Sequence, residues 1–206
     1  MDYLPFNTAG LSLDGVDVFY KTYEVLKSNF HIQQTGNIDF NLEQFGVFKH
    51  ALTINIRGSF VIKQCDNDCY IFFIETHYKG IGHKGGLTEH YEYQTWALAY
   101  LKHDFGRVLI RRETLADKII ELLHPVELDF NEDKAFSDTF YVLVSDHTKA
   151  IAGINRDFRN AVMDVRCDDF TIEIVEHTLL IGSRQPIPPE KAIHLTEFIE
   201  RVAELC

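Results

Sequence analysis

The clearest pattern of hydrophobic and polar positions lies between residues 136 and 181. Phe136, Phe140 and Val144 share one face of the stretch 136–145, and residues 170–175 alternate in the same way, as half-buried strands do. Between the two stretches, apolar residues recur at three- and four-residue spacing, which places them on one side of helical segments. They are Ile151, Ile154, Phe158, Val162 and Val165. With the apolar run 179–181, this pattern predicts a strand, helix and hairpin unit that can close a core.

Runs of β-branched and aromatic residues in the first half predict a sheet. The runs are 51–56, 60–62, 70–74, 91–100 and 108–110. Arg57-Gly58 and residues 66–68 interrupt them only briefly, whereas a parallel connection needs about a dozen residues or more. The short breaks therefore predict hairpins and an antiparallel sheet of about five strands.

Helices are predicted near both ends of the chain and between its halves. An apolar stripe over 18–26 follows Asp14 and Asp17, and acidic residues suit the N-terminus of a helix. A second helix is predicted over 113–123, and a third follows the prolines of 186–189. The apolar stripe of this C-terminal helix consists of Leu195, Phe198, Ile199 and Val202.

Together these elements predict an α+β fold, with a mostly antiparallel sheet, helices packed on one face and a C-terminal helix. A length of 206 residues suits a single domain over 1–206. The alternative is two lobes, a β-rich lobe at about 16–112 and a strand-helix-hairpin-helix lobe at about 113–206. The composition, with 46% hydrophobic and 25% charged residues, is that of a soluble globular protein, so we expect a packed core.

Acidic residues outnumber basic ones by 31 to 20, which gives a formal net charge of −11. Nucleic-acid binding depends on clustered Lys and Arg, so we expect no nucleic-acid partner. Arg107, Arg111 and Arg112 form the main basic cluster, around an apolar strand. We interpret it as a solvated edge, with an anion site as the alternative.

The sequence contains no apolar run of membrane-spanning length, and residues 1–5 lack the basic and apolar regions of a signal peptide. We therefore expect no transmembrane segment and a cytoplasmic protein. The four cysteines are Cys65, Cys69, Cys167 and Cys206. They are too few for a dense disulfide framework, and we expect them to remain thiols.

Histidines and cysteines gather along the predicted hairpin around the glycine-rich loop 79–86. Imidazole and thiolate are the ligands that zinc prefers, and a tetrahedral site needs four converging ligands. His77, His83 and His90 could converge if the loop folds back, whereas Cys65 and Cys69 lie a strand's length away. The sequence thus offers a zinc site at the three histidines, with a polar, solvent-compatible loop as the alternative.

Other motifs predict no catalytic residue. Residues 80–85 match G-x-G-x-x-G, but strand formers rather than a helix follow them, so we reject nucleotide binding. Ser145-Asp146-His147 is interpreted as a helix cap, and Cys167 has no histidine near it in the sequence. Two pairs of carboxylates are interpreted as solvated, because nothing around them favours acid-base work. They are Asp168 with Asp169 and Glu75 with Glu89.

Aromatic residues are concentrated on the predicted strand 91–100. Strand alternation places Tyr91 and Tyr93 on one face and Trp96 on the other. Exposed aromatic rings are common in recognition surfaces, because they supply contact area at low entropic cost. Tyr91, Tyr93 and Trp96 therefore predict a ligand or partner surface. The alternative is that these rings pack a helix onto the sheet.

Five stretches of the chain resemble a broad group of uncharacterised bacterial proteins of unknown function. They are 56–60, 70–78, 94–96, 136–146 and 173–181. The shared pattern is a glycine-containing strand, two aromatic strands and a strand-helix-hairpin-helix tail. The resemblance implies a fold and a bacterial source, and it supplies no catalytic residue.

Because no catalytic constellation is acceptable, we predict a non-catalytic cytoplasmic binding or interaction domain. Its partner would be another protein or a second copy of the chain in a homodimer, and the sequence identifies no small-molecule ligand. The alternative prediction is a metal-dependent hydrolase-like enzyme, with zinc held by His77, His83 and His90.

Overall fold

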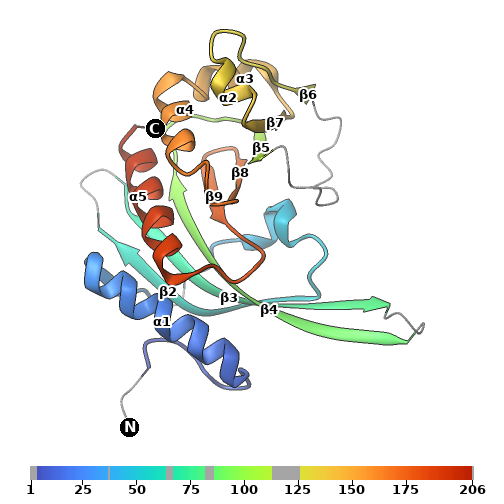
Figure 1. Ribbon diagram of the computed structural model, residues 1–206, viewed down its shortest axis with the longest axis vertical. Helices are drawn as coiled ribbons and strands as arrows, with labels where there is room; N and C mark the ends of the chain where they lie inside the picture. Colours follow the sequence, from blue (N-terminus) through green and yellow to red (C-terminus); the bar gives the residue numbers. More distant parts are fainter. Residues whose placement is uncertain (1–3, 37, 64–66, 82–85, 113–125, 206) are drawn as a thin grey trace.

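The computed structural model describes residues 4–36, 38–63, 67–81, 86–112 and 126–205. Its strands are β1 (Ile32–Gln34), β2 (Thr53–Ile62), β3 (Cys69–Ile81), β4 (Leu87–Tyr100), β5 (Arg107–Arg112), β6 (Val126–Glu127), β7 (Phe140–Val144), β8 (Thr171–Val175) and β9 (Thr178–Gly182). Its helices are α1 (Leu13–Asn29), α2 (Lys134–Ser137), α3 (His147–Gly153), α4 (Arg156–Asp164) and α5 (Pro189–Leu205), with short 3-10 segments η1 (Leu42–Gln44) and η2 (Gly46–Phe48). The predicted α+β class is confirmed (Figure 1).

The described strands form one nine-stranded sheet in the order β1-β2-β3-β4-β9-β8-β5-β7-β6. Every neighbouring pair of these strands is antiparallel. β5, from the first predicted lobe, lies between β8 and β7 from the second. A single sheet therefore contains strands from both predicted lobes, 16–112 and 113–206.

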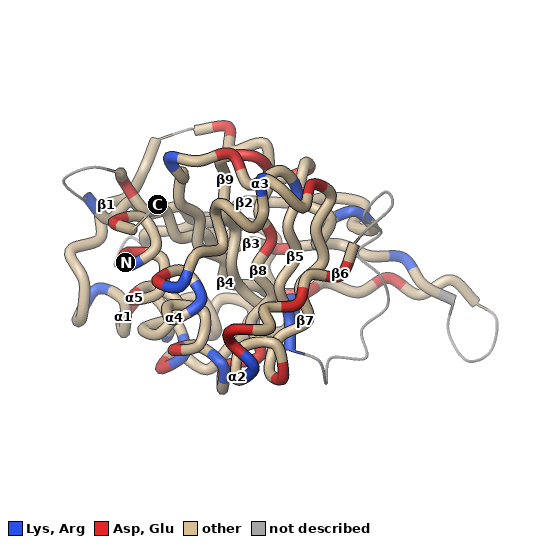
Figure 2. Tube along the Cα trace, turned by 90° about the horizontal axis from the view of Figure 1, so that it is seen from above, with Lys and Arg blue, Asp and Glu red and all other residues tan. Residues whose placement is uncertain are grey.

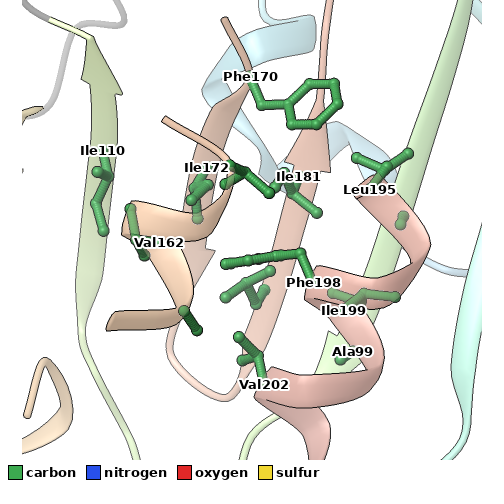
Figure 3. Packing of buried hydrophobic residues seen from close by; sticks show 14 of the residues in the cluster. Ala99, Ile110, Val162, Phe170, Ile172, Ile181, Leu195, Phe198, Ile199 and Val202 are labelled. Carbon is green, nitrogen blue, oxygen red and sulfur yellow. The ribbon is translucent and has the colours of Figure 1, made fainter. Parts of the chain in front are cut away.

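The larger hydrophobic core lies on the face of the sheet that α1, α4 and α5 cover. Figure 3 shows Phe198 and Val202 of α5 directed toward Val162 of α4 and Ile181 of β9. The four residues of the predicted C-terminal stripe are all buried, which confirms that helix and its orientation. Since burying one such side chain contributes roughly 1.5–3 kcal/mol, α5 is a main source of stability.

A smaller core covers the opposite face of the sheet. The η1 and η2 segment brings Phe45 and Phe48 against Phe72 and Trp96, and the rings of Phe48 and Trp96 lie 5.3 Å apart between centroids. The sequence of this segment shows no helical or strand-like spacing of apolar residues, so the second layer could not be predicted. The central strands are consequently buried on both faces.

β2 differs from the pair of strands predicted at this point. Arg57-Gly58 does not end a strand but forms a bulge, where the register shifts between Ile56 and Gly58. A side chain at Gly58 would place its Cβ 2.8 Å from the Cβ of Phe6, so glycine is required by close packing. The predicted break was wrong because a glycine signals a bulge as readily as a turn.

The stretch 136–145 is also divided differently from the prediction. Phe136 lies in α2, because Asp133 caps this short helix by accepting a hydrogen bond from the Phe136 N–H at 3.3 Å, and the strand starts only at Phe140. Asp146 caps α3 as predicted, accepting from the Lys149 N–H at 3.1 Å. The predicted helix over 113–123 lies outside the described residues. Among the described helices, none has the length and hydrophobicity needed to cross a bilayer.

Candidate functional site

The hairpin of β3 and β4 extends beyond the strands on either side of it. β2 pairs with β3 no further than Thr53 opposite His77, and β9 pairs with β4 only from Trp96 to Tyr100. The remaining part of the hairpin, residues 78–81 and 87–93, projects from the body of the protein (Figure 1). We call this part the arm. Figure 2 shows the arm from above, with charged residues along it.

The hairpin of β3 and β4 places two of the predicted zinc ligands on opposite faces. His77 pairs in register with Tyr91, and His90 pairs with Tyr78, so neighbouring positions 77 and 78 direct the two imidazoles to different sides. His77 stacks on Tyr91 at 4.6 Å between centroids, and His90 stacks on Tyr78 at 5.3 Å. His83 lies outside the described residues. The structure therefore does not bring His77 and His90 together.

Each of these imidazoles instead lies beside a carboxylate. His77 Nε2 is 3.3 Å from Glu89 Oε2, and His90 Nε2 is 3.6 Å from Glu92 Oε1. Lys79 also approaches Glu89 at 3.3 Å, and it is the main cause of a lowered pKa for that carboxyl group. Within the described residues, no three His, Cys, Asp or Glu side chains are placed to share a metal ion.

The three residues of the predicted aromatic surface have different environments. Tyr91 is 51% exposed, whereas Trp96 is fully buried in the smaller core. Tyr93 is half-buried, and its ring meets that of Phe19 in α1 edge to face at 5.9 Å. The accessible part of this surface is therefore Tyr91, and Tyr93 packs a helix onto the sheet as the alternative interpretation expects.

A chain of polar side chains leads from Trp96 outward along the sheet. Trp96 Nε1 donates to Gln94 Oε1 at 2.7 Å, and Gln94 Nε2 donates to Thr76 Oγ1 and Glu92 Oε2, both at 2.9 Å. Gln94 and Thr76 are fully buried. Sequence reasoning missed this network, although its members lie at alternate positions of two paired strands. A satisfied buried network fixes the local register.

Glu75 forms the most deeply buried ion pair of the sheet. Its Oε2 accepts hydrogen bonds from Arg57 Nε at 3.1 Å, from Arg57 Nη2 and from Asn55 Nδ2 at 3.2 Å. The remaining Arg57 nitrogen, Nη1, donates to the carbonyl of Ala9 at 2.9 Å. Glu75 and Glu89, considered as a pair in the sequence, thus belong to separate ion pairs.

A groove of about 1010 Å³ lies beside the outer edge of β2. Its floor is residues 56–59 of β2, and its walls come from the N-terminal segment 4–8 and from residues 34–36 and 38–39. Two backbone hydrogen bonds hold the walls in place: the Asn7 N–H donates to Arg57 O at 2.6 Å, and the Thr35 N–H donates to Ser59 O at 2.9 Å.

The part of β2 that borders the groove is only partly paired on its outer side. β1 pairs with β2 through Phe60, Val61 and Ile62, and the carbonyls of Ser59 and Arg57 accept from Thr35 and Asn7. Among the described residues, no strand pairs with the outer side of 53–56, which is the open part of this edge. An open strand edge presents unpaired backbone N–H and C=O groups, which another extended chain can bind.

The three arginines of the predicted basic cluster, Arg107, Arg111 and Arg112, all contact side chains of the same chain. Arg107 Nη1 lies 3.9 Å from Glu173 Oε1, Arg112 Nη1 lies 3.0 Å from Asp169 Oδ1, and Arg111 lies over the Tyr141 ring.

Glu173 of β8 in turn connects the sheet to η2 through hydrogen bonds. Its two oxygens accept from the N–H groups of Gly46 at 2.7 Å and Val47 at 3.0 Å. The carboxyl group is almost completely buried, and this burial raises its pKa although the backbone donors and Arg107 act in the opposite direction.

A smaller cavity of about 240 Å³ lies between α4 and α5. Cys167, Asp168 and His194 all line it. Asp168 is buried, and its Oδ2 lies 3.1 Å from His194 Nδ1. Cys167 thus has a histidine in the same cavity, which the sequence did not show because His194 comes from a distant helix.

Comparison with known proteins found no matching family model and no matching curated protein. Among solved structures, the chain is similar to the crystal structure of the mycobacterial trehalose monomycolate transport factor A, TtfA. The TM-score is 0.60, and the match covers 91% of this chain and 93% of that chain at 12% sequence identity. At this identity the likeness establishes a shared fold, and function must be argued from the site.

Proposed function

We propose that this chain is a non-catalytic binding domain that receives an extended polypeptide segment of a protein partner in the groove beside β2. The observation that carries this proposal is that the groove lies along the outer edge of β2, next to residues 53–56, whose outer side pairs with no described strand. An extended peptide that adds to a sheet edge gains main-chain hydrogen bonds, and side-chain pockets then give specificity. The groove walls, from the N-terminal segment 4–8 and from residues 34–36 and 38–39, would hold such a peptide from both sides.

The lining of the groove favours a peptide over other ligands. Gln34, Thr35 and Ser59 give the lining polar side chains, which are hydrogen-bonded within the protein, while Ile38 and Ile56 are 44% and 38% exposed and offer apolar contact. This mixture does not suit a lipid chain, and the net charge of −11 does not suit a nucleic acid. The same negative charge favours a partner segment that is neutral or basic, with aliphatic side chains at alternate positions.

Two further considerations agree with a binding role. TtfA, which shares the fold, is described as a transport factor. The hydrolase alternative draws no support from the described residues, because His77 and His90 lie on opposite faces of the hairpin. A cytoplasmic location and self-association stay predictions of the sequence.

A peptide-display selection against the purified protein tests the proposal. The groove variant carries Ile38→Glu and Ile56→Glu, which change exposed residues and so should leave the fold intact. Ile151→Glu is the matched control, because Ile151 is 48% exposed on α3 and lies outside the groove lining. Fluorescence anisotropy then gives the affinity of each selected peptide for the three proteins.

We expect selected peptides to bind the wild type and Ile151→Glu equally and to bind the groove variant at least about tenfold more weakly. Losing two apolar contacts and adding two charges accounts for a change of this size. Failure to select any peptide, or equal binding to the groove variant, would show that the groove does not receive a polypeptide.

A further inference from the structure

Tyr78, at the base of the arm, has a buried hydroxyl group without a partner. The residue is 5% exposed, and its Oη has no hydrogen-bond partner among the described residues. Buried tyrosine hydroxyls normally find such a partner, because leaving one unpaired costs free energy. The exception therefore requires an explanation.

Arg184, which follows β9, presents a second unpaired donor to the same place. Its guanidinium lies over the Tyr78 ring, 5.1 Å from the centroid, and its Nε is also buried without a hydrogen-bond partner. Within the described part of the chain, Arg184 forms no ion pair, although the protein has 31 acidic residues. Two side chains in contact thus each lack an acceptor.

The acidic side chain of Glu92, on the same strand as His90, contacts other groups. Glu92 Oε2 already accepts from Gln94 Nε2 at 2.9 Å, and Glu92 Oε1 lies 3.6 Å from His90 Nε2. Arginine only donates hydrogen bonds and is always charged, so an acceptor that carries negative charge suits this pair of donors best. A carboxylate or a phosphate group has this chemistry.

Although Tyr78 Oη and Arg184 Nε are buried, part of the Arg184 side chain reaches the surface, where an anion can meet its guanidinium. Arg184 as a whole is half-buried, and His90, which also stacks on Tyr78, is 54% exposed. β9 leaves β4 at Gly182, opposite Trp96, so no described strand lies on the outer side of residues 87–95 (Figure 1). The groove beside β2 is separate, because β3 and β4 lie between it and β9.

From these observations, we propose that Tyr78 and Arg184 form a binding site for an oxyanion, a carboxylate or a phosphate group, at the open edge of β4. Arg184 supplies the charge and Tyr78 Oη the second donor. The site does not depend on the groove or on a polypeptide partner.

The proposal can be tested on the full chain by NMR of the arginine Nε–H groups. Sodium phosphate and sodium acetate are added in separate titrations at constant ionic strength, and Arg184→Lys assigns the Arg184 signal. The Nε–H of Arg112, whose guanidinium is paired with Asp169, is the internal control. Tyr78→Phe removes the second donor, and its urea midpoint shows whether the fold is retained.

We expect a saturable shift of the Arg184 signal, and Tyr78→Phe should weaken the binding about tenfold or more without lowering the urea midpoint. Saturation by phosphate alone would identify a phosphate-bearing ligand, and saturation by acetate alone would identify a carboxylate-bearing one. Saturation by both would support an oxyanion site without discrimination. No shift at Arg184, or an equal and unsaturable shift at Arg112, would show an adventitious ion only and overturn the proposal.

Discussion

Replacing Arg57 by alanine would leave Glu75 buried without its main partner. The Glu75 side chain is 3% exposed and that of Arg57 is 14% exposed, so water screens this pair weakly. Removing one partner of a buried ion pair costs roughly 3–5 kcal/mol. Asn55 Nδ2 would still donate to Glu75, so we expect a loss near the lower end, about 3 kcal/mol of unfolding free energy.

Urea unfolding at neutral pH measures this loss. Lys21→Ala is the control, because its ion pair with Asp17 has side chains 61% and 58% exposed and should contribute less than about 0.5 kcal/mol. Adding Glu75→Gln to Arg57→Ala removes the uncompensated charge and should recover more than half of the loss. A loss below about 1 kcal/mol for Arg57→Ala, or no recovery in the double variant, refutes the reasoning.

Two further predictions concern buried ionisable groups. Burial raises the pKa of Glu173, so the folded chain binds this proton more readily than the unfolded chain. The wild type should therefore gain stability relative to Glu173→Gln as the pH falls from neutral toward the ordinary carboxyl value of 4.5, and a pH-independent difference in urea unfolding would contradict this. Burial also raises the pKa of Cys69 to about 12. Iodoacetamide should therefore modify exposed Cys167 and spare Cys69 in the folded protein. Modification of both cysteines at equal rates, measured by mass spectrometry, would contradict this prediction.

The long helices α1 and α5 could be predicted from the sequence because their period is local. Phe19 and Leu26 of α1 are both fully buried, as the stripe over 18–26 indicates. Ser12 caps α1 by accepting from the Gly15 N–H at 3.1 Å, and the acidic residue Asp14 lies in the first turn. Such signals act over a few residues, so tertiary contacts do not overrule them here.

The lengths of the strands relative to one another could not be predicted. The arm exists because β2 begins only at Thr53 and β9 stops at Gly182, while β3 and β4 extend beyond both of these residues. Likewise, the groove exists because β1 is only three residues long. These are properties of strand pairing, and the alternation of residues within one strand does not specify where its neighbour stops.

The side-chain contacts of the candidate sites join segments far apart in the sequence. Tyr78 of β3 meets Arg184 after β9, and Asp168 meets His194 of α5. No spacing rule connects such residues. The zinc prediction relied on three histidines of one hairpin, but strand alternation directs His77 and His90 to opposite faces once their register is known.

Amide hydrogen exchange with and without a bound, display-selected peptide is the most direct test of the proposed groove. If the peptide adds to the open edge of β2, exchange of residues 53–56 should slow on binding, because their outer backbone groups become paired. The control Ile151→Glu should show the same protection. Protection confined to another region, such as α4 and α5, would contradict a polypeptide-binding function of this groove.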